Sequence, residues 1–149
     1  MAQSSLSKKL LIKPGYNVAL LNAPADYIAL LGDLPDDVTL AQQIEGQYDV
    51  VQLFAATKDQ VDQLGPAAIK AVKPGGLLWI AYRKQVPKGE VRTIHRDVGW
   101  EMVYQAGWEG VSLIAIDDVW AAMRFRPSAA IKSTSNRRAT LVDTMNKEE

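Results

Sequence analysis

The feature that most constrains this chain is a Pro-Gly-Gly turn followed by an apolar run, Lys73-Pro74-Gly75-Gly76-Leu77-Leu78-Trp79-Ile80-Ala81-Tyr82. Apolar residues before the turn recur at helical spacing, so the segment predicts a helix that ends at the two glycines and a buried strand that begins at Leu77. A helix that leads directly into an all-apolar strand is typical of the crossover unit of a parallel sheet. The predicted fold class is therefore α/β.

The composition limits the classes of function. The chain has 149 residues, enough for one domain with its own core, and 17 basic residues balance 17 acidic ones, whereas a dedicated nucleic-acid binder normally carries a basic excess. It has no cysteine and a single histidine, His95, which excludes disulfides, thiolate catalysis and His- or Cys-rich metal sites. Neither a membrane span nor a signal peptide is recognisable. We expect a cytoplasmic protein without a metal and without nucleic-acid or membrane partners.

Turn residues divide the N-terminal half of the chain. We expect a flexible N-terminus over residues 1–9 and a first strand over residues 16–21. Asn22 is expected to cap a short helix that ends at Gly32. The inward residues of that helix would be Tyr27, Ile28 and Leu31. Residues 38–40 fit a short edge strand or the start of a helix, and the pattern does not distinguish the two.

The middle of the chain has the clearest periodicity. Residues 48–55 predict a strand, and Thr57 and Gln60 match a capping box at the start of the next helix. Pro66 is expected to kink or divide this helix near Gly65. Its predicted inward face is formed by Val61, Leu64, Ala68, Ala71 and Val72.

The C-terminal part predicts one more helix and a hairpin. A polar loop over residues 83–92 precedes Thr93, a candidate cap for a helix that Gly107 would end. The inward face of that helix would be Ile94, Val98, Met102 and Ala106. Two strands within residues 111–126 read as a hairpin whose second strand is a half-exposed edge strand. We expect the folded domain to cover residues 10–127 and a flexible tail to cover residues 128–149.

The order of these elements resembles a known family. The helix and the Lys73-Pro74-Gly75-Gly76-Leu77-Leu78-Trp79 segment resemble the part before the fifth strand of class I S-adenosylmethionine-dependent methyltransferases. The hairpin at residues 111–125 is similar to the antiparallel sixth and seventh strands that close their sheet. The resemblance covers residues 48–127 and implies a Rossmann-like three-layer sandwich, with a mostly parallel sheet closed by a C-terminal antiparallel hairpin. S-adenosylmethionine is the cofactor that it suggests.

The first half departs from that family. The turn after the first strand is Asn22-Ala23-Pro24-Ala25, which has no glycine to bring the backbone close to a cofactor and has a proline that cannot donate a hydrogen bond. Enzymes of that family have an acidic residue after the second strand that holds the ribose hydroxyls of the cofactor. No acidic residue here clearly matches it, and Glu45 is not assigned that role. Too little chain separates Gly32 from Tyr48 for the usual strand, helix and strand. The Gly-Trp and Asp-Asp-Val-Trp segments also resemble a small uncharacterised bacterial family of such truncated domains.

Three functions follow as hypotheses. The first is a non-catalytic binding or interaction module that has lost its cofactor and self-associates through an edge strand or an exposed tryptophan. The second is an active methyltransferase with a non-standard cofactor turn. The third is a nucleotide- or phosphate-binding regulatory protein. Four tryptophans without an obvious catalytic set favour binding over chemistry, so we assign no catalytic residue.

Six residues are candidates for ligand binding because the ligand of an open α/β sheet binds beyond the carboxyl ends of its strands, where the strand order reverses. These residues are Asn22, Ala23, Thr57, Tyr82, Arg83 and Lys84. Asn22 and Thr57 at helix N-termini favour anions, although both also serve as ordinary caps. Arg83, Lys84 and Arg92 suit a phosphate or carboxylate, although loop cations are commonly only solvated.

Other polar pairs and the tryptophans are more ambiguous. His95 with Asp97 suits acid–base work or the surface, and Asp117-Asp118 suits a carboxylate pair or a hairpin turn. Trp79 is expected in the core. Trp100 and Trp120 are expected to be partly exposed, where they would line a pocket or a dimer face.

Overall fold

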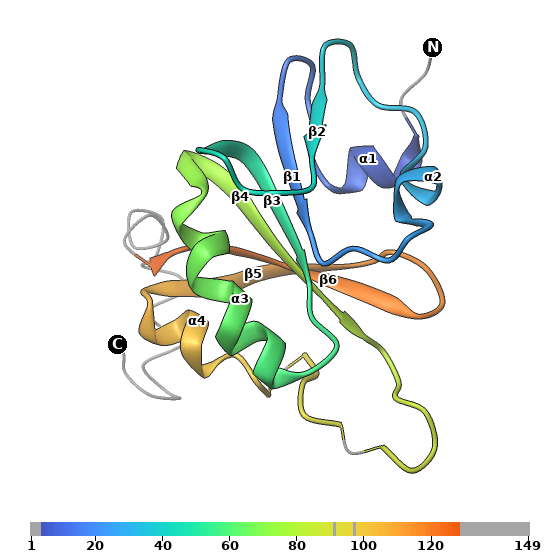
Figure 1. The fold of residues 1–149 in the computed structure, drawn as a ribbon, viewed down its shortest axis with the longest axis vertical. Coiled ribbons are helices and arrows are strands. Elements are labelled where there is room, and N and C mark those ends of the chain that lie inside the picture. The colour runs from blue at the N-terminus through green and yellow to red at the C-terminus, as the bar shows by residue number, and fades with distance from the viewer. Residues whose placement is uncertain (1–3, 91, 97, 129–149) are drawn as a thin grey trace.

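The computed structural model describes residues 4–90, 92–96 and 98–128, which form an α/β sandwich around one mixed sheet (Figure 1). The strands are β1 (Asn17–Leu21), β2 (Thr39–Ala41), β3 (Tyr48–Phe54), β4 (Val72–Arg83), β5 (Trp108–Ala115) and β6 (Trp120–Pro127), and the helices are α1 (Ser5–Lys9), α2 (Tyr27–Leu31), α3 (Lys58–Lys70) and α4 (Glu101–Gln105). The sheet order is β2-β1-β3-β4-β6-β5. The first four strands are parallel and β6 is antiparallel to both neighbours. This confirms the predicted fold class.

Helices cover both faces of the sheet. Helices α3 and α4 lie on one face and α1 and α2 on the other, as Figure 1 shows. In β3, Val51 and Leu53 belong to the core under α3, whereas Val50 and Phe54 belong to the core under α1 and α2. Strands buried on both faces read as continuous apolar runs, which is why the sequence identified β3 and β4 so readily.

The N-terminal segment contains a helix that the sequence did not predict. Residues 1–9 were expected to be flexible, yet Ser5–Lys9 form α1, and the Ser4 hydroxyl caps it by accepting a hydrogen bond from the Ser7 backbone N–H. Leu6 and Leu10 are buried against the sheet. The Trp79 indole N–H donates to the Leu10 carbonyl oxygen at 3.1 Å and ties this helix to β4. The interaction spans 69 positions in sequence, so local periodicity gave no sign of it.

Helix α3 confirms the predicted cap but not the predicted break. The Thr57 hydroxyl accepts from the Gln60 N–H, and the Gln60 side chain accepts from the Ala56 N–H. The helix continues through Pro66 to Lys70. Gly65 is buried where a Cβ would lie 2.2 Å from the Met102 methyl carbon, so the absent side chain lets α4 pack closely.

The Pro-Gly-Gly segment lies inside β4 rather than before it. Val72 already pairs with Tyr48 of β3, and the next partners are Leu77 and Val50. The residues between Val72 and Leu77 are therefore an irregular insertion in the strand. Gly75 has a φ of 79°, a left-handed conformation that glycine adopts without strain.

The predicted exposed edge strand is wrong in its position. β6 lies between β4 and β5, and Ala121, Ala122, Met123 and Phe125 are buried. The edge is β5 instead. The alternation of Trp120, Ala122, Arg124 and Arg126 arises because the cover over their face is incomplete and leaves Arg124 half-buried and Arg126 exposed. At the other end, residues 39–41 form β2, which resolves the choice between strand and helix.

The helices at residues 22–32 and 93–106 are shorter than predicted. The cap of α2 is Asp26 rather than Asn22, and Ile28 is exposed rather than inward, although Gly32 does end the helix. The later helix begins only at Glu101, because His95 and Val98 before it form a small antiparallel bridge. Trp100, expected to be partly exposed, is buried, and its indole N–H donates to the carbonyls of His95 and Arg96.

Leu11 generates a prediction about stability. It follows α1 in a left-handed conformation with φ 64°, its N–H donates to the Lys8 carbonyl, and its side chain is 40% exposed. Glycine is preferred at this position, and a β-carbon there costs about 1 kcal/mol. We expect Leu11→Gly to raise the free energy of unfolding by about 0.5–1 kcal/mol in urea titrations. Leu11→Ala keeps the β-carbon and its strain, so it should not raise the free energy of unfolding. Equal effects of the two variants would contradict the explanation.

Candidate functional site

The carboxyl ends of β1 and β3 define the expected ligand crevice. From β1 the chain passes to β2 on one side of it and then to β3 on the other, so the strand order reverses between them. A ligand of an open α/β sheet binds at such a point. In this protein the crevice is bridged: the Asn22 side-chain amide donates to the Phe54 carbonyl oxygen at 2.8 Å.

The turn after β1 uses asparagine where a glycine-rich turn would use glycine. Asn22 has a φ of 59°, and asparagine is among the few residues other than glycine that adopt this conformation readily. The backbone direction is therefore preserved, but a side chain has been added. Because its amide is bonded to Phe54, that side chain holds the ends of β1 and β3 together.

A cavity of about 270 Å³ lies beside this bridge, at the ends of β1 and β2. Its lining residues are Leu20, Asn22, Ala23, Pro24, Ala25, Ile28 and Gln42. Two of the six sequence candidates, Asn22 and Ala23, are among them. Gln42 directly follows β2, the position for which the sequence had offered no acidic residue. None of these seven side chains is titratable, and polar atoms contribute about as much of the cavity surface as apolar atoms do.

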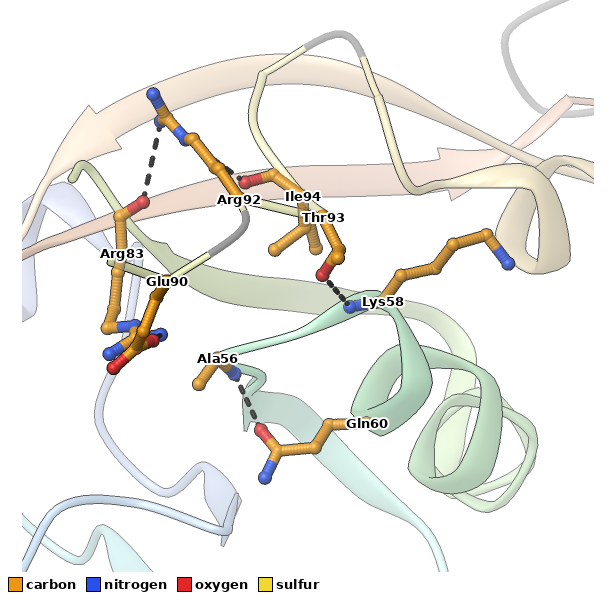
Figure 2. A network of polar contacts seen from close by, with 8 residues as sticks. All are labelled: Ala56, Lys58, Gln60, Arg83, Glu90, Arg92, Thr93 and Ile94. Carbon is orange, nitrogen blue, oxygen red and sulfur yellow. Dashed lines mark hydrogen bonds and ion pairs between the residues drawn. The ribbon is translucent and has the colours of Figure 1, made fainter. Parts of the chain in front are cut away.

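The N-terminus of α3 is already occupied by protein acceptors (Figure 2). Thr57 and Gln60 form the cap, and the Thr93 hydroxyl, expected to cap its own helix, accepts from the Lys58 backbone N–H at 2.9 Å. Backbone donors at a helix start bind anions only while they lack other partners. Thr57 is therefore a structural cap here.

Two arginines of the loop after β4, Arg83 and Arg92, have protein partners (Figure 2), although the Arg83 Nε is buried without one among the described residues. The Arg83 guanidinium pairs with Glu90 at 3.0 Å, and Arg92 donates to the carbonyls of Arg83 and Ile94. The Lys84 backbone N–H donates to the Val119 carbonyl, which joins the loop to the hairpin.

The remaining sequence candidates have mainly structural surroundings. Tyr82 is buried, and its ring packs edge-on against Trp100. The Asp117 carboxylate accepts from the N–H groups of Val119 and Trp120, as expected of a hairpin turn. Asp97 lies outside the described residues, so its pairing with His95 remains a prediction. Among the described residues, no group of His, Asp and Glu side chains is placed to hold a metal ion, and no helix is long and apolar enough to cross a membrane.

A buried polar pair was missed from the sequence. Tyr27, the first residue of α2, and Gln52 of β3 are almost without solvent exposure. Burial raises the pKa of the Tyr27 hydroxyl; the nearby Gln52 side chain partly opposes this rise and the Asp117 charge adds to it. Neither the hydroxyl nor the amide has hydrogen-bond geometry to any described protein group. The sequence contained one sign of this pair: Gln52 is a polar residue whose neighbours at positions 50, 51, 53 and 54 are all apolar.

Comparison with solved structures identifies the fold. DhpI in complex with S-adenosylhomocysteine matches with a TM-score of 0.53 and 17% identity over 82% of this chain and 80% of that one. The m1A22 tRNA methyltransferase TrmK of B. subtilis matches with a TM-score of 0.54 and 11% identity over 95% of this chain and 74% of that one. The ribosomal protein L11 methylase of Lactobacillus delbrueckii subsp. bulgaricus matches with a TM-score of 0.52 and 11% identity over 80% of this chain and 73% of that one. No protein-family model and no curated protein matches.

The chain therefore has a fold like that of class I S-adenosylmethionine-dependent methyltransferases. In sequence it is only distantly similar to these enzymes, so the likeness establishes the fold and not an activity.

Asn22 gives a prediction that separates its two roles. Asn22→Gly keeps the left-handed backbone but loses the bond to Phe54, and should lower the free energy of unfolding by about 1 kcal/mol. Asn22→Ala loses the bond to Phe54 and also places a residue that disfavours the left-handed conformation there, so it should lower the free energy of unfolding by about 2 kcal/mol. Urea titrations measure both changes. A glycine variant as stable as the parent would show that the bridge contributes nothing.

Tyr27 predicts a dependence on alkaline pH. Its pKa is raised in the folded state, so above about pH 10 the unfolded chain loses a proton that the folded chain retains. Stability from this group is complete below that pH and declines as the pH rises. We expect Tyr27→Phe to flatten the decline in free energy of unfolding between about pH 9 and 11. A decline in Tyr27→Phe as steep as that of the parent protein would contradict this assignment.

Proposed function

We propose that this protein is a non-catalytic binding or interaction module derived from a methyltransferase-like fold. The observation that carries the proposal is the hydrogen bond from Asn22 to the Phe54 carbonyl oxygen, which crosses the crevice where such a fold would receive its cofactor. Removing it would cost stability, and a ligand there would have to replace it.

The residues around the crevice do not fit S-adenosylmethionine in the manner of the resembled family. That manner needs a glycine-rich turn and an acidic residue for the ribose hydroxyls. Here the turn contains Pro24, which has no N–H to offer, and the residue after β2 is Gln42, whose amide lacks a charge. The cavity that remains suits a small neutral ligand better than a cationic cofactor.

The two alternative functions have less support. An active methyltransferase needs the cofactor site described above, and no titratable side chain lines the cavity to move a proton. A phosphate bound by Arg83 would have to compete with its ion pair to Glu90, and the α3 N-terminus already has Thr57 and Thr93 as acceptors.

Calorimetric titration with S-adenosylmethionine and S-adenosylhomocysteine tests the proposal. We expect no binding tighter than about 100 µM, equivalent to about −5.5 kcal/mol, and no rise in melting temperature. Asn22→Gly, which opens the crevice but leaves Pro24 and Gln42, should also fail to bind. Saturable binding by the parent protein at lower concentration would contradict the proposal and favour the enzyme.

A further inference from the structure

Two buried side chains of the core carry polar groups that no protein group satisfies. The Tyr27 hydroxyl and both ends of the Gln52 side-chain amide have no hydrogen-bond partner among the described residues, and the two residues are 1% and 0% exposed. An unpaired buried polar group costs stability, so such groups nearly always bond to protein or to an ordered water. We propose that Tyr27 and Gln52 form a binding site for one internal water molecule, which joins α2 to β3.

The two polar groups lie in the same layer of the core. Gln52 is two positions from Val50 and from Phe54, so these three side chains point to one face of the sheet, the face covered by α1 and α2. The Tyr27 ring packs edge-on against Phe54, with 4.6 Å between the ring centroids. Burial raises the pKa of the Tyr27 hydroxyl, and Gln52 is close enough to oppose that rise. The hydroxyl and the amide are therefore near neighbours inside one apolar layer.

The strands beside Gln52 supply no partner for its amide. Gln52 lies opposite Leu20 of β1 and Trp79 of β4. The Leu20 side chain is apolar, and the Trp79 indole N–H already donates to the Leu10 carbonyl oxygen. β3 is paired on both sides, so the neighbouring backbone groups are taken up by the sheet. A partner for the amide therefore has to come from outside the sheet.

The hairpin turn does not satisfy the Tyr27 hydroxyl either. Burial is the main cause of the raised pKa of Tyr27, and the charge of Asp117 in this turn adds to it. The Asp117 carboxylate, however, accepts from the N–H groups of Val119 and Trp120. The Tyr27 hydroxyl therefore keeps its proton and has no protein acceptor for it among the described residues.

Water matches this pair of groups better than an ion does. Both groups are neutral, so a cation would have no charged ligand and an anion would have no charge to balance it. A water can accept the hydroxyl proton of Tyr27 and donate to the Gln52 amide oxygen. The Gln52 amide N–H is a third possible partner, and buried waters use about two to four.

The proposed water lies next to residues that line the cavity. Ile28 follows Tyr27 in α2 and lines it, and Leu20, which lies opposite Gln52, lines it too. Helix α2 has five residues and no side-chain cap, so a water-mediated bond to β3 helps to hold it in place. Neither Tyr27 nor Gln52 lines the cavity itself, so the water site and the prediction about the cofactor can fail separately.

A crystal structure that shows ordered waters is the most direct test. We expect one water within about 2.7–3.2 Å of both the Tyr27 hydroxyl oxygen and a Gln52 amide atom. A variant that combines Tyr27→Phe with Gln52→Leu should have no water there, because apolar cavities stay dry. A direct hydrogen bond between Tyr27 and Gln52 without a water, or a parent structure with no water bonded to both, would overturn the proposal.

Magnetic relaxation dispersion of the water signal tests the site in solution, because it counts internal waters that exchange slowly. The double variant of Tyr27 and Gln52 should hold one such water fewer than the parent protein. Tyr48→Phe is the matched control: it also removes a buried hydroxyl, but one that bonds to the backbone of Gln43 and Glu45, so the number should not change. Circular dichroism confirms that each variant is folded. A folded double variant with as many slowly exchanging waters as the parent would overturn the proposal, and if it does not fold, the crystal structure of the parent decides.

Discussion

The burial of β3 and β4 between two apolar layers is the constraint on which the rest of the structure depends. Val51 and Leu53 face α3 while Val50 and Phe54 face α1 and α2, so both sides of these strands need a cover. The cover on the second side consists of two five-residue helices. Buried leucines such as Leu10 and Leu31 pack this cover onto the sheet, and Trp79 also donates to the end of α1. Two short helices are thus enough to complete a three-layer core.

A side chain of the protein also holds together the crevice between the ends of β1 and β3. A glycine-rich turn leaves space beside the backbone, and a ligand then contributes to stability when it binds. Here Asn22 adopts the conformation of glycine and also supplies a side chain that bonds to the end of β3. At the start of α3, Thr93 fills a comparable role for the Lys58 N–H. At both places a side chain of the protein itself bonds a backbone group near the end of β3 or the start of α3.

Much of the fold could be predicted from the sequence because its signals are local. The apolar runs of β3 and β4, the Thr57 cap and the hairpin turn at Asp117 each depend on neighbours in sequence. Helix α1, the packing of Trp100 against Phe125 and the interior position of β6 depend on distant partners, and no periodicity reveals those. The site was predicted in part: Asn22 and Ala23 line the cavity, but Gln42 and the bond to Phe54 become visible only when β1, β2 and β3 are aligned.

The most direct test of the central claim is to observe the Asn22 side-chain amide by nuclear magnetic resonance during a titration. S-adenosylmethionine would be added to about 1 mM, ten times a dissociation constant of about 100 µM. If the bridged crevice, with Pro24 in its turn and Gln42 after β2, does not accept the cofactor, the side-chain amide signals of Asn22 and the backbone signals of Ala23 and Gln42 will not move. Saturable shifts at these three residues would contradict the account and show that the crevice still accepts the cofactor.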